Sequence, residues 1–245
     1  MSKSTDKKNS SVVFLIPSPL HESGINSIHP EIKDIIGRCQ VFFVENERSA
    51  RRYLKQLRRE LIIDDYEWYL LPMASKTTDS AAAVEIFRKK IEEGKNIGII
   101  SEAGCPGVAD PGQLLIAAAH EMNITIKPLA GPSSILLALM ASGMNGQHFR
   151  FCGYLPINPA ERIKSIKELE AESAKKNCTQ IFIETPYRNN QLIEALLKTC
   201  RPSTRICIAA ALTGPHELIK TKSVNEWKKE KPDLHKQPAL FCLLA

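Results

Sequence analysis

The fold is decided by a loop rich in glycine and proline, which reads Ser101-Glu102-Ala103-Gly104-Cys105-Pro106-Gly107-Val108-Ala109-Asp110-Pro111-Gly112. An apolar run at 96–100 precedes this loop, and a second apolar segment at 114–119 follows it. A strand that ends in such a loop and continues as a helix is where open α/β sheets bind ligands. Glycines let the backbone approach a ligand closely, and prolines stiffen the turns between them. We therefore predict a ligand-binding loop.

The loop does not identify its ligand. It has neither the G-x-G-x-x-G pattern of dinucleotide-binding loops nor the lysine of a phosphate-binding P-loop. A connection that only requires tight turns is therefore an alternative. Asp110 followed by Pro111 is typical of a helix N-cap and first helical residue, which predicts a helix over 111–121.

The composition is that of a globular protein large enough for one large or two small domains, with 245 residues and a net charge of +6. The polar stretch 1–11 is expected to be a disordered arm, since it lacks the apolar core of a secretory signal. No apolar run reaches membrane-spanning length. The seven cysteines form no C-x-x-C pair and the six histidines have no metal-ligand spacing. We therefore expect reduced thiols, no metal site and a cytoplasmic protein.

Short apolar strands alternate with amphipathic helices in the first half, which predicts a mainly parallel α/β sheet. The expected strands are 12–16, 41–44, 97–100 and 124–127, and the expected helices are 30–38, 47–60, 79–93 and 111–121. After a helix near 133–142, the second half has strands near 149–153, 179–183, 205–210, 215–221 and 238–244. The last three follow one another closely, which favours antiparallel pairing. This change of pattern predicts two α/β domains, 12–130 and 131–245, the second with a mixed sheet.

The predicted helix over 47–60 carries a basic stripe, composed of Arg48, Arg51, Arg52, Lys55, Arg58 and Arg59. At 100° per residue these cations lie within an arc of roughly 120°, opposite an apolar face. Only Glu47 and Glu60 are nearby carboxylates, so few of the cations can be paired within the helix. A stripe of unpaired cations on a basic chain favours a polyphosphate partner, which we expect to be RNA. An ordinary solvated face is the alternative.

Six segments in a fixed order carry a family resemblance. They are Leu15-Ile16-Pro17-Ser18-Pro19, Glu45-Asn46-Glu47-Arg48, the start of the 101–112 loop with Asp110-Pro111-Gly112, Pro128-Leu129-Ala130-Gly131-Pro132-Ser133, Phe151-Cys152-Gly153-Tyr154-Leu155-Pro156 and Phe182-Ile183-Glu184-Thr185-Pro186-Tyr187-Arg188. Together they resemble the tetrapyrrole methylase superfamily, the class III S-adenosylmethionine (AdoMet) methyltransferases. Within it, the chain is most similar to the subfamily that methylates a ribose 2′-hydroxyl of small-subunit ribosomal RNA.

The resemblance implies two α/β domains in a homodimer, with AdoMet bound in a cleft between the domains. By matching position, the implied cofactor-binding residues of the first domain are Pro17, Glu102, Ala103, Gly104 and Val108. Those implied for the second domain are Ser133, Ser134, Glu184, Leu212, Pro238 and Ala239. Helix capping by the two serines and an ordinary salt bridge at Glu184 are the alternatives.

The implied chemistry is direct displacement at the sulfonium methyl group, in which positioning supplies most of the catalysis. A ribose hydroxyl is a poor nucleophile while protonated, so a nearby base would assist. Glu45 and Asp110 are the carboxylates nearest the expected ligand edge, and the sequence assigns a catalytic role to neither.

The chain departs from the ribosomal RNA subfamily mainly on the substrate side. Residues 17–22 lack that subfamily's Gly-Asn pair, 71–75 replace a His-Asp-rich stretch, and 211–214 lack one carboxylate and one amine. Our leading hypothesis is an AdoMet-dependent methyltransferase that acts on RNA. The alternatives are methylation of a tetrapyrrole or other small molecule, and an inactive relative that binds RNA or cofactor.

Overall fold

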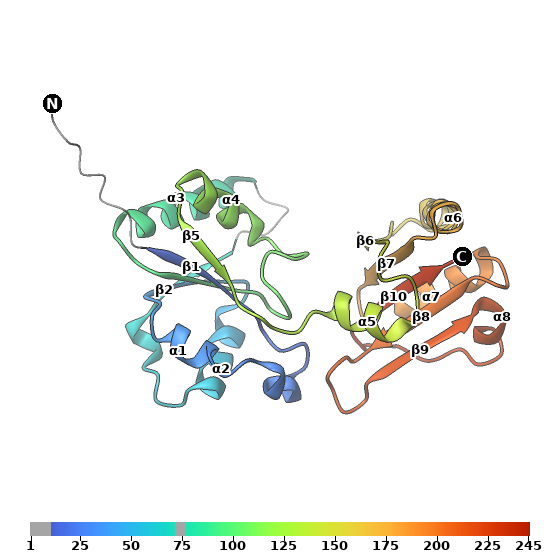
Figure 1. The fold of residues 1–245 in the computed structure, drawn as a ribbon, viewed down its shortest axis with the longest axis horizontal. Coiled ribbons are helices and arrows are strands. Elements are labelled where there is room, and N and C mark those ends of the chain that lie inside the picture. Colours follow the sequence, from blue (N-terminus) through green and yellow to red (C-terminus); the bar gives the residue numbers. More distant parts are fainter. Residues whose placement is uncertain (1–10, 72–76) are drawn as a thin grey trace. The chain divides into compact units, whose positions relative to one another are not determined.

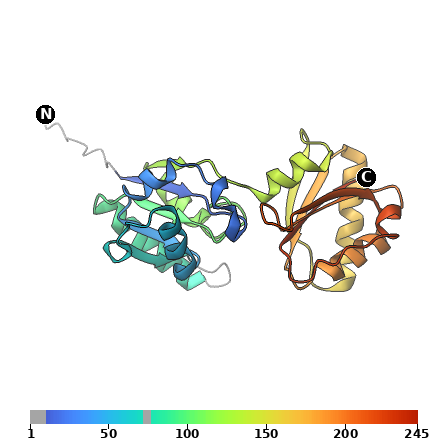
Figure 2. The same ribbon diagram turned by 90° about the horizontal axis from the view of Figure 1, so that it is seen from below.

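The computed structural model of this protein describes residues 11–71 and 77–245 (Figures 1 and 2). The chain divides into two compact units, Met1–Pro132 and Ser133–Ala245. The boundary expected after Ala130 lies two residues before this division. The expected arm falls mostly outside the described residues, and Ser11, its last residue, is buried.

The first unit is a parallel sheet covered by helices on both faces. Its strands are β1 (Val12–Ile16), β2 (Val41–Val44), β3 (Glu67–Leu70), β4 (Ile97–Ile100) and β5 (Thr125–Pro128), in the order β3-β2-β4-β1-β5. Helices α1 (Ile32–Ile36) and α2 (Glu47–Leu57) cover one face, and α3 (Thr77–Glu92) and α4 (Gln113–Glu121) cover the other (Figure 1). Two 3₁₀ turns, η1 (Glu22–Ser27) and η2 (Ile63–Asp65), lie in the connections.

Strands β1 to β4 each contribute to both hydrophobic cores because side chains alternate across a strand. In β1, Val13 joins the core under α3 and α4, whereas Phe14 and Ile16 join the core under α1 and α2. Strands buried on both faces are near-continuous apolar runs, as in Val-Phe-Phe-Val of β2. The parallel sheet that the sequence predicts is confirmed.

The second unit is a mixed sheet with the order β6-β7-β10-β8-β9. Its strands are β6 (Phe149–Tyr154), β7 (Thr179–Glu184), β8 (Arg205–Ala210), β9 (Leu218–Ser223) and β10 (Ala239–Leu244). Only β6 and β7 are parallel, and the predicted antiparallel pairing of the last three strands is confirmed. Helices α6 (Pro159–Lys176), α7 (Asn189–Thr199) and α8 (Val224–Trp227) share one core with this sheet, while α5 (Ser134–Ser142) packs against β8, β9 and β10.

Several predicted helix ends differ from the structure, and two of the differences bear on the site. Helix α4 begins at Gln113 with Gly112 as its N-cap, because the Asp110 carboxylate bonds to the loop before the helix. Helix α2 ends at Leu57, and Arg58 has extended backbone angles, so the last two cations of the predicted stripe lie beyond the helix. Three further elements, β3, α6 and α7, are not predicted from the sequence. Among the residues that the structure describes, no helix is long and apolar enough to cross a membrane.

Candidate functional site

The carboxyl ends of three neighbouring strands bring the predicted residues of the first unit together. Strands β2 and β1 both pair with β4, with Val44 and Ile16 each opposite Ile100. The residues that follow, Glu45, Pro17 and Ser101, therefore leave the sheet at one edge. This is the edge at which open α/β sheets bind ligands.

The 101–112 loop is fastened to the turn after β1. Ser18 and Gly104 exchange two backbone hydrogen bonds, of 2.8 and 3.0 Å, in an isolated antiparallel bridge. The Ser18 hydroxyl donates to the Ser101 carbonyl at 2.7 Å, and the Ser101 hydroxyl donates to the Gly104 carbonyl at 3.1 Å. Gly104 has φ +77°, a left-handed conformation that favours glycine. These bonds leave Glu102 and Ala103 exposed at the tip.

One oxygen of Asp110 closes the far end of the same loop. Asp110 Oδ1 accepts hydrogen bonds from the backbone N–H groups of Gly107 and Gly112, each at 2.8 Å. Asp110 Oδ2 is buried and has no hydrogen-bond partner within the described residues. Burial raises the pKa of this carboxyl, and the two backbone bonds offset part of that rise. Asp110 Oδ2 is therefore available to accept a hydrogen bond from a ligand.

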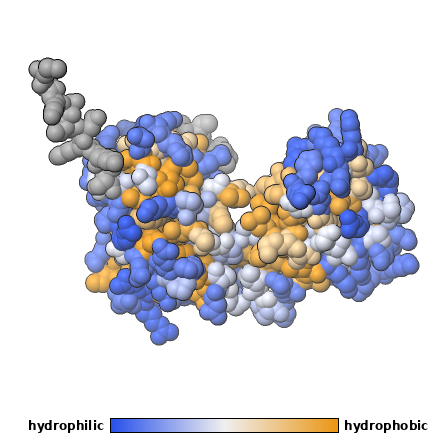
Figure 3. Space-filling model, viewed as in Figure 1, coloured by the Kyte–Doolittle hydropathy of each residue, from blue (hydrophilic) through white to orange (hydrophobic). Residues whose placement is uncertain are grey.

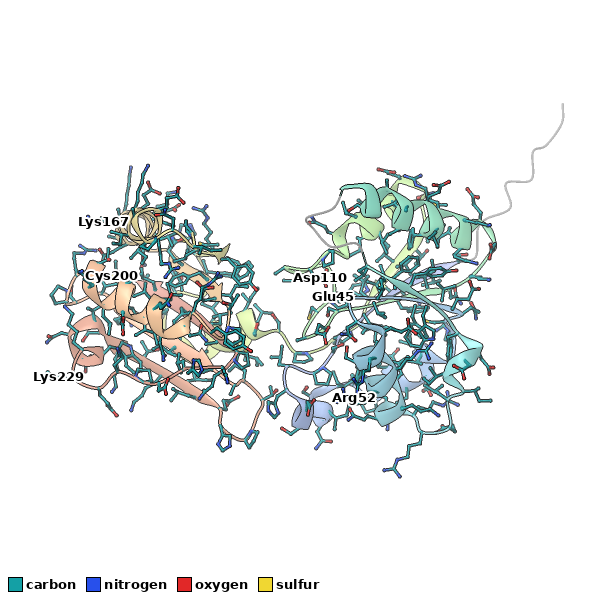
Figure 4. The ribbon with its side chains drawn as sticks, turned by 180° about the vertical axis from the view of Figure 1, so that it is seen from behind. Glu45, Arg52, Asp110, Lys167, Cys200 and Lys229 are labelled. Atoms are coloured by element: carbon teal, nitrogen blue, oxygen red, sulfur yellow. The ribbon has the colours of Figure 1, made fainter. Side chains whose placement is uncertain are left out.

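A second carboxylate lies beside Asp110. Glu45 Oε1 accepts a hydrogen bond from the backbone N–H of Glu102 at 2.7 Å. Partial burial raises the pKa of Glu45, the bond from Glu102 lowers it, and the negative charges of Asp110 and Glu102 raise it further. Glu45 and Asp110 lie close to each other at this edge, as Figure 4 shows. The edge therefore presents acidic oxygens suited to cationic or hydrogen-donating ligands.

Pro17 is held from both sides. The Tyr53 hydroxyl of α2 donates to the Pro17 carbonyl at 2.6 Å. A Cβ added at Gly131 would lie 2.2 Å from the Pro17 Cβ, so only glycine fits there. Val108, the remaining candidate of the first unit, is half exposed later in the loop, with 50% of its surface accessible.

A cavity of about 280 Å³ extends from the exposed tip of the loop to α2. Ser101, Glu102 and Ala103 line one side of it, and His21, Glu22, Ser49, Arg52 and Gln56 line the other. Arg52 forms an ion pair with Glu22 at 3.4 Å across this lining. Polar side chains therefore connect the predicted ligand loop with the predicted basic helix.

The candidates of the second unit also converge on one sheet edge. Ala239 pairs with Glu184 on one side and with Ala210 on the other. The backbone N–H of Ala211 donates to the Pro238 carbonyl at 2.9 Å, and Leu212, the next residue, is buried. The structure thus brings Glu184, Leu212, Pro238 and Ala239 together.

This edge carries buried oxygens that lack partners. The Glu184 side chain is fully buried; its Oε1 accepts from Arg188 at 2.6 Å and from the Thr185 backbone at 2.7 Å. Glu184 Oε2, Asn189 Oδ1 and Thr213 Oγ1 are buried without a hydrogen-bond partner among the described residues. Such atoms are rare in folded proteins, and a ligand's donors are one way to satisfy them. Ser133 instead caps α5 through a bond from the Leu136 N–H, and Ser134 begins that helix.

The basic stripe is only partly free. Arg51 pairs with Glu47 and Asp64 and stacks on the Trp68 ring, 5.3 Å from its centroid. Arg58 pairs with Glu60 at 2.8 Å, and Arg52 pairs with Glu22. No carboxylate within the described ranges forms an ion pair with the others, Arg48, Lys55 and Arg59, which are exposed. Few cations are paired within the helix, as expected, but the stripe is not unpaired, because Glu22 of η1 and Asp64 of η2 reach Arg52 and Arg51 from outside it.

Groups that contact the site from distant parts of the chain leave no local signal in the sequence. No local sequence pattern indicates that Tyr53 bonds to Pro17. None indicates that the side-chain oxygens of Asn189 and Thr213 are buried without a described partner near Glu184. The substituted segment at 71–75 lies outside the described residues from Pro72 onward. In the part of the chain that is described, no group of three or more His, Cys, Asp or Glu residues could hold a metal ion.

The chain is similar in sequence to known proteins. Two relatives are each named ribosomal RNA small subunit methyltransferase I. That of Escherichia coli O157:H7 is 34% identical over 149 residues, which are 60% of this chain and 51% of that protein. That of Coprothermobacter proteolyticus is 24% identical over 227 residues, 88% of this chain and 95% of that protein. The chain thus spans about half the length of the E. coli relative.

The fold is also found among solved structures. Diphthine synthase superposes with a TM-score of 0.64 at 13% identity, over 96% of this chain and 90% of that one. The model of the tetrapyrrole (corrin/porphyrin) methylases matches residues 26–227, which include the Gly- and Pro-rich loop, Glu45 and Glu184, whereas Pro17, Pro238 and Ala239 lie outside this range. This protein belongs to the tetrapyrrole (corrin/porphyrin) methylase family.

Proposed function

We propose that this protein is an AdoMet-dependent methyltransferase whose substrate is RNA, most specifically a ribose 2′-hydroxyl of small-subunit ribosomal RNA. The family and the names of its relatives support methyl transfer and a ribosomal substrate. The observation that carries the proposal is the fastened 101–112 loop, whose exposed tip lies beside acidic oxygens with spare acceptor capacity.

The residues present fit AdoMet chemically. The cofactor carries a sulfonium and an ammonium charge, together with ribose hydroxyl and adenine amino donors, and it supplies a transferable methyl group. Asp110 Oδ2 and Glu184 Oε2 are buried acceptors with free lone pairs, which suit such donors. In the first unit we propose that Pro17, Glu102, Ala103, Gly104 and Val108 contact the cofactor. In the second unit we propose Ser133, Ser134, Glu184, Leu212, Pro238 and Ala239.

The chain's own part in the reaction is to hold the acceptor hydroxyl in line with the methyl group and to receive its proton. Good alignment of the reacting groups can lower the activation free energy by several kcal/mol, so a rigid loop contributes directly to catalysis. Glu45 and Asp110 are the candidates for the base, because the raised pKa of each carboxyl makes its carboxylate a better proton acceptor. We assign the role to neither in preference.

The RNA would meet the first unit at α2. Arg48, Lys55 and Arg59 pair with no described carboxylate and can neutralise phosphates, whereas Arg51, Arg52 and Arg58 have carboxylate partners. Arg52 lines the cavity next to the loop tip, so its guanidinium is positioned to contact the phosphate of the target nucleotide. A cytoplasmic homodimer is part of the same proposal.

Calorimetric titration with AdoMet and with its demethylated product tests the cofactor assignment. We expect micromolar binding, and at least tenfold weaker binding in the Ala103→Leu variant, since Ala103 is exposed at the tip and its enlargement should leave the fold intact. Ala82→Leu enlarges an exposed alanine of α3 and is the matched control. A folded protein that binds neither compound would contradict the proposal.

A methyl-transfer assay on deproteinised ribosomal RNA, from cells that lack this protein, tests the substrate. Radiolabel in RNA, located at a ribose by nuclease digestion, supports the proposed reaction. Cofactor binding together with unlabelled RNA would indicate a different substrate or an inactive relative.

A further inference from the structure

We infer that the RNA-binding surface continues from α2 across the end of α1 to a pocket at the free edge of the first sheet, which binds one phosphate and one unpaired base of RNA. This inference rests on the proposed RNA substrate. It adds a binding site on the far side of α1, away from the loop that would hold the cofactor.

The pocket lies between α1 and β5 and has a volume of about 410 Å³. Among the described strands, β5 pairs only with β1 and is the last of the sheet, so no described strand covers its outer edge. Phe14, Ile32 and Ile35 contribute buried apolar side chains to the lining. In Figure 3, apolar surface is visible along this face of the first unit, interrupted by polar residues. An apolar floor under an open rim suits a flat aromatic group.

The rim of the pocket is cationic. Arg38 and Lys127 both line it and are exposed, and neither forms an ion pair with any described carboxylate. The Arg38 guanidinium lies 5.2 Å from the centroid of the Phe14 ring, which orients it over the floor. The other ionisable groups of the lining are His29 and Glu31, which lie 3.9 Å apart. The lining therefore has two cations, Arg38 and Lys127, against one carboxylate, Glu31, and its net charge is positive.

Arg58 connects this pocket with α2. A Cβ added at Gly37 would lie 3.0 Å from Arg58 Nη1, so the Arg58 guanidinium sits over the end of α1, where Arg38 follows Gly37 in the sequence. The partner of Arg58 is Glu60, whose pKa is lowered by hydrogen bonds from its own backbone and from Arg58, and further by the charge of Lys33. Cations thus follow one another from Arg48 and Lys55 to Arg38 and Lys127.

This combination of charge and apolar floor favours single-stranded RNA. A phosphate between Arg38 and Lys127 would satisfy both cations, while a base stacks on the outer face of the Arg38 guanidinium, whose inner face already covers the Phe14 ring. Base stacking on apolar or aromatic groups and on arginine is how proteins commonly hold unpaired bases. The bases of a duplex remain stacked within the helix and cannot enter such a pocket, so the pocket predicts a preference for unpaired RNA.

Fluorescence anisotropy with the full chain tests the site. The probe is a fluorescein-labelled single-stranded RNA of about 20 nucleotides and mixed sequence, with its duplex for comparison, titrated at several salt concentrations. Three double variants are compared: Arg38→Gln with Lys127→Gln at the pocket, Arg48→Gln with Lys55→Gln on α2, and Lys164→Gln with Lys167→Gln on α6. The last pair is the charge-matched control, since both lysines are exposed on α6 of the second unit; Lys167 is labelled in Figure 4.

We expect the pocket variant to bind the single strand about tenfold more weakly at moderate salt. The slope of log affinity against log salt concentration should become shallower by about 0.7 for each phosphate that the variant no longer neutralises. Its binding to the duplex should change less, and its thermal unfolding should match that of the control.

Two outcomes would overturn the inference in different ways. If the α2 variant loses affinity while the pocket variant behaves like the control, the pocket inference is wrong and the proposed RNA substrate stands. If the unmodified chain binds neither RNA, both are wrong.

Discussion

The carboxylate of Glu45 anchors the backbone of another acidic residue, Glu102, through a 2.7 Å hydrogen bond. The bond joins the end of β2 to the exposed tip of the 101–112 loop, and it brings a charge close to Asp110. Two elements distant in sequence thereby share one small acidic surface. A substitution at this surface should therefore change the stability of the fold, the pKa values of the carboxyl groups and the affinity for the cofactor together.

Replacing Glu45 should separate its anchoring role from its charge. Glu45→Gln retains an acceptor for the Glu102 N–H, so we expect cofactor affinity to fall less than threefold. Glu45→Ala leaves that N–H without its partner and releases the loop tip, so affinity should fall about tenfold, equivalent to roughly 1.4 kcal/mol. Calorimetry with the demethylated cofactor measures both. Equal losses in the two variants would show that charge, and not anchoring, is what matters.

Asp110 should make stability depend on pH. Its pKa is raised in the folded state, so the folded protein holds this proton more tightly than the unfolded chain does. The resulting stabilisation is present below the unfolded pKa and is lost as pH rises through the folded pKa. Asp110→Asn removes the titration while retaining an acceptor at Oδ1, so it should flatten the difference in melting temperature between pH 4 and pH 7.

The alanine substitution at the same position provides the contrast. Asp110→Ala leaves the N–H groups of Gly107 and Gly112 without their acceptor and should cost about 1–3 kcal/mol at every pH. An asparagine variant that is as unstable as the alanine variant would contradict this account of Asp110.

Tyr53 should link α2 to the turn after β1. Tyr53→Phe removes the donor to the buried Pro17 carbonyl and should destabilise the protein by about 1–2 kcal/mol, with weaker cofactor binding. Tyr66→Phe, at a half-buried tyrosine that packs edge-on against Phe42 in the same core, is the control. Urea unfolding compares the two, and we expect the control to lie within about 0.5 kcal/mol of the unmodified protein.

Gly131 should tolerate no side chain. In Gly131→Ala the new Cβ would meet the Pro17 ring at 2.2–2.3 Å, so one of the two loops must move. Overpacking of this kind costs about 1–3 kcal/mol. Gly146→Ala adds a methyl group where nothing lies within 4 Å and should have little effect. Thermal unfolding of both variants checks this, and an unchanged melting temperature in Gly131→Ala would contradict the close packing of Gly131 on Pro17.

How much of the fold could be predicted from the sequence depends on whether the determinants are local. Strands β1, β2 and β4 match their predicted bounds because each is a continuous apolar run rich in β-branched or aromatic residues. Strand β3 is not predicted, since Glu67-Trp-Tyr-Leu is a four-residue edge strand without a clear apolar pattern. Its place in the sheet is set by pairing with β2, which is a tertiary effect.

The candidate sites show the same division. Glycine and proline spacing locates the ligand loop, but its closure depends on Ser18, which is 83 residues from Ser101. Helical periodicity places the basic stripe, yet the helix ends early, and Arg51 is neutralised by Asp64 from outside the helix. Local patterns thus indicate where a site lies, and contacts between distant segments decide which of its atoms are free.

Asp110 Oδ1 has a consequence for the kinetics of binding. A loop that is already closed by one oxygen at two glycines has lost most of its conformational entropy before any ligand arrives. Ligand encounter then does not wait for loop ordering, and association should proceed at rates typical of a preformed site. Differences in affinity among cofactor analogues should therefore appear almost entirely as differences in residence time.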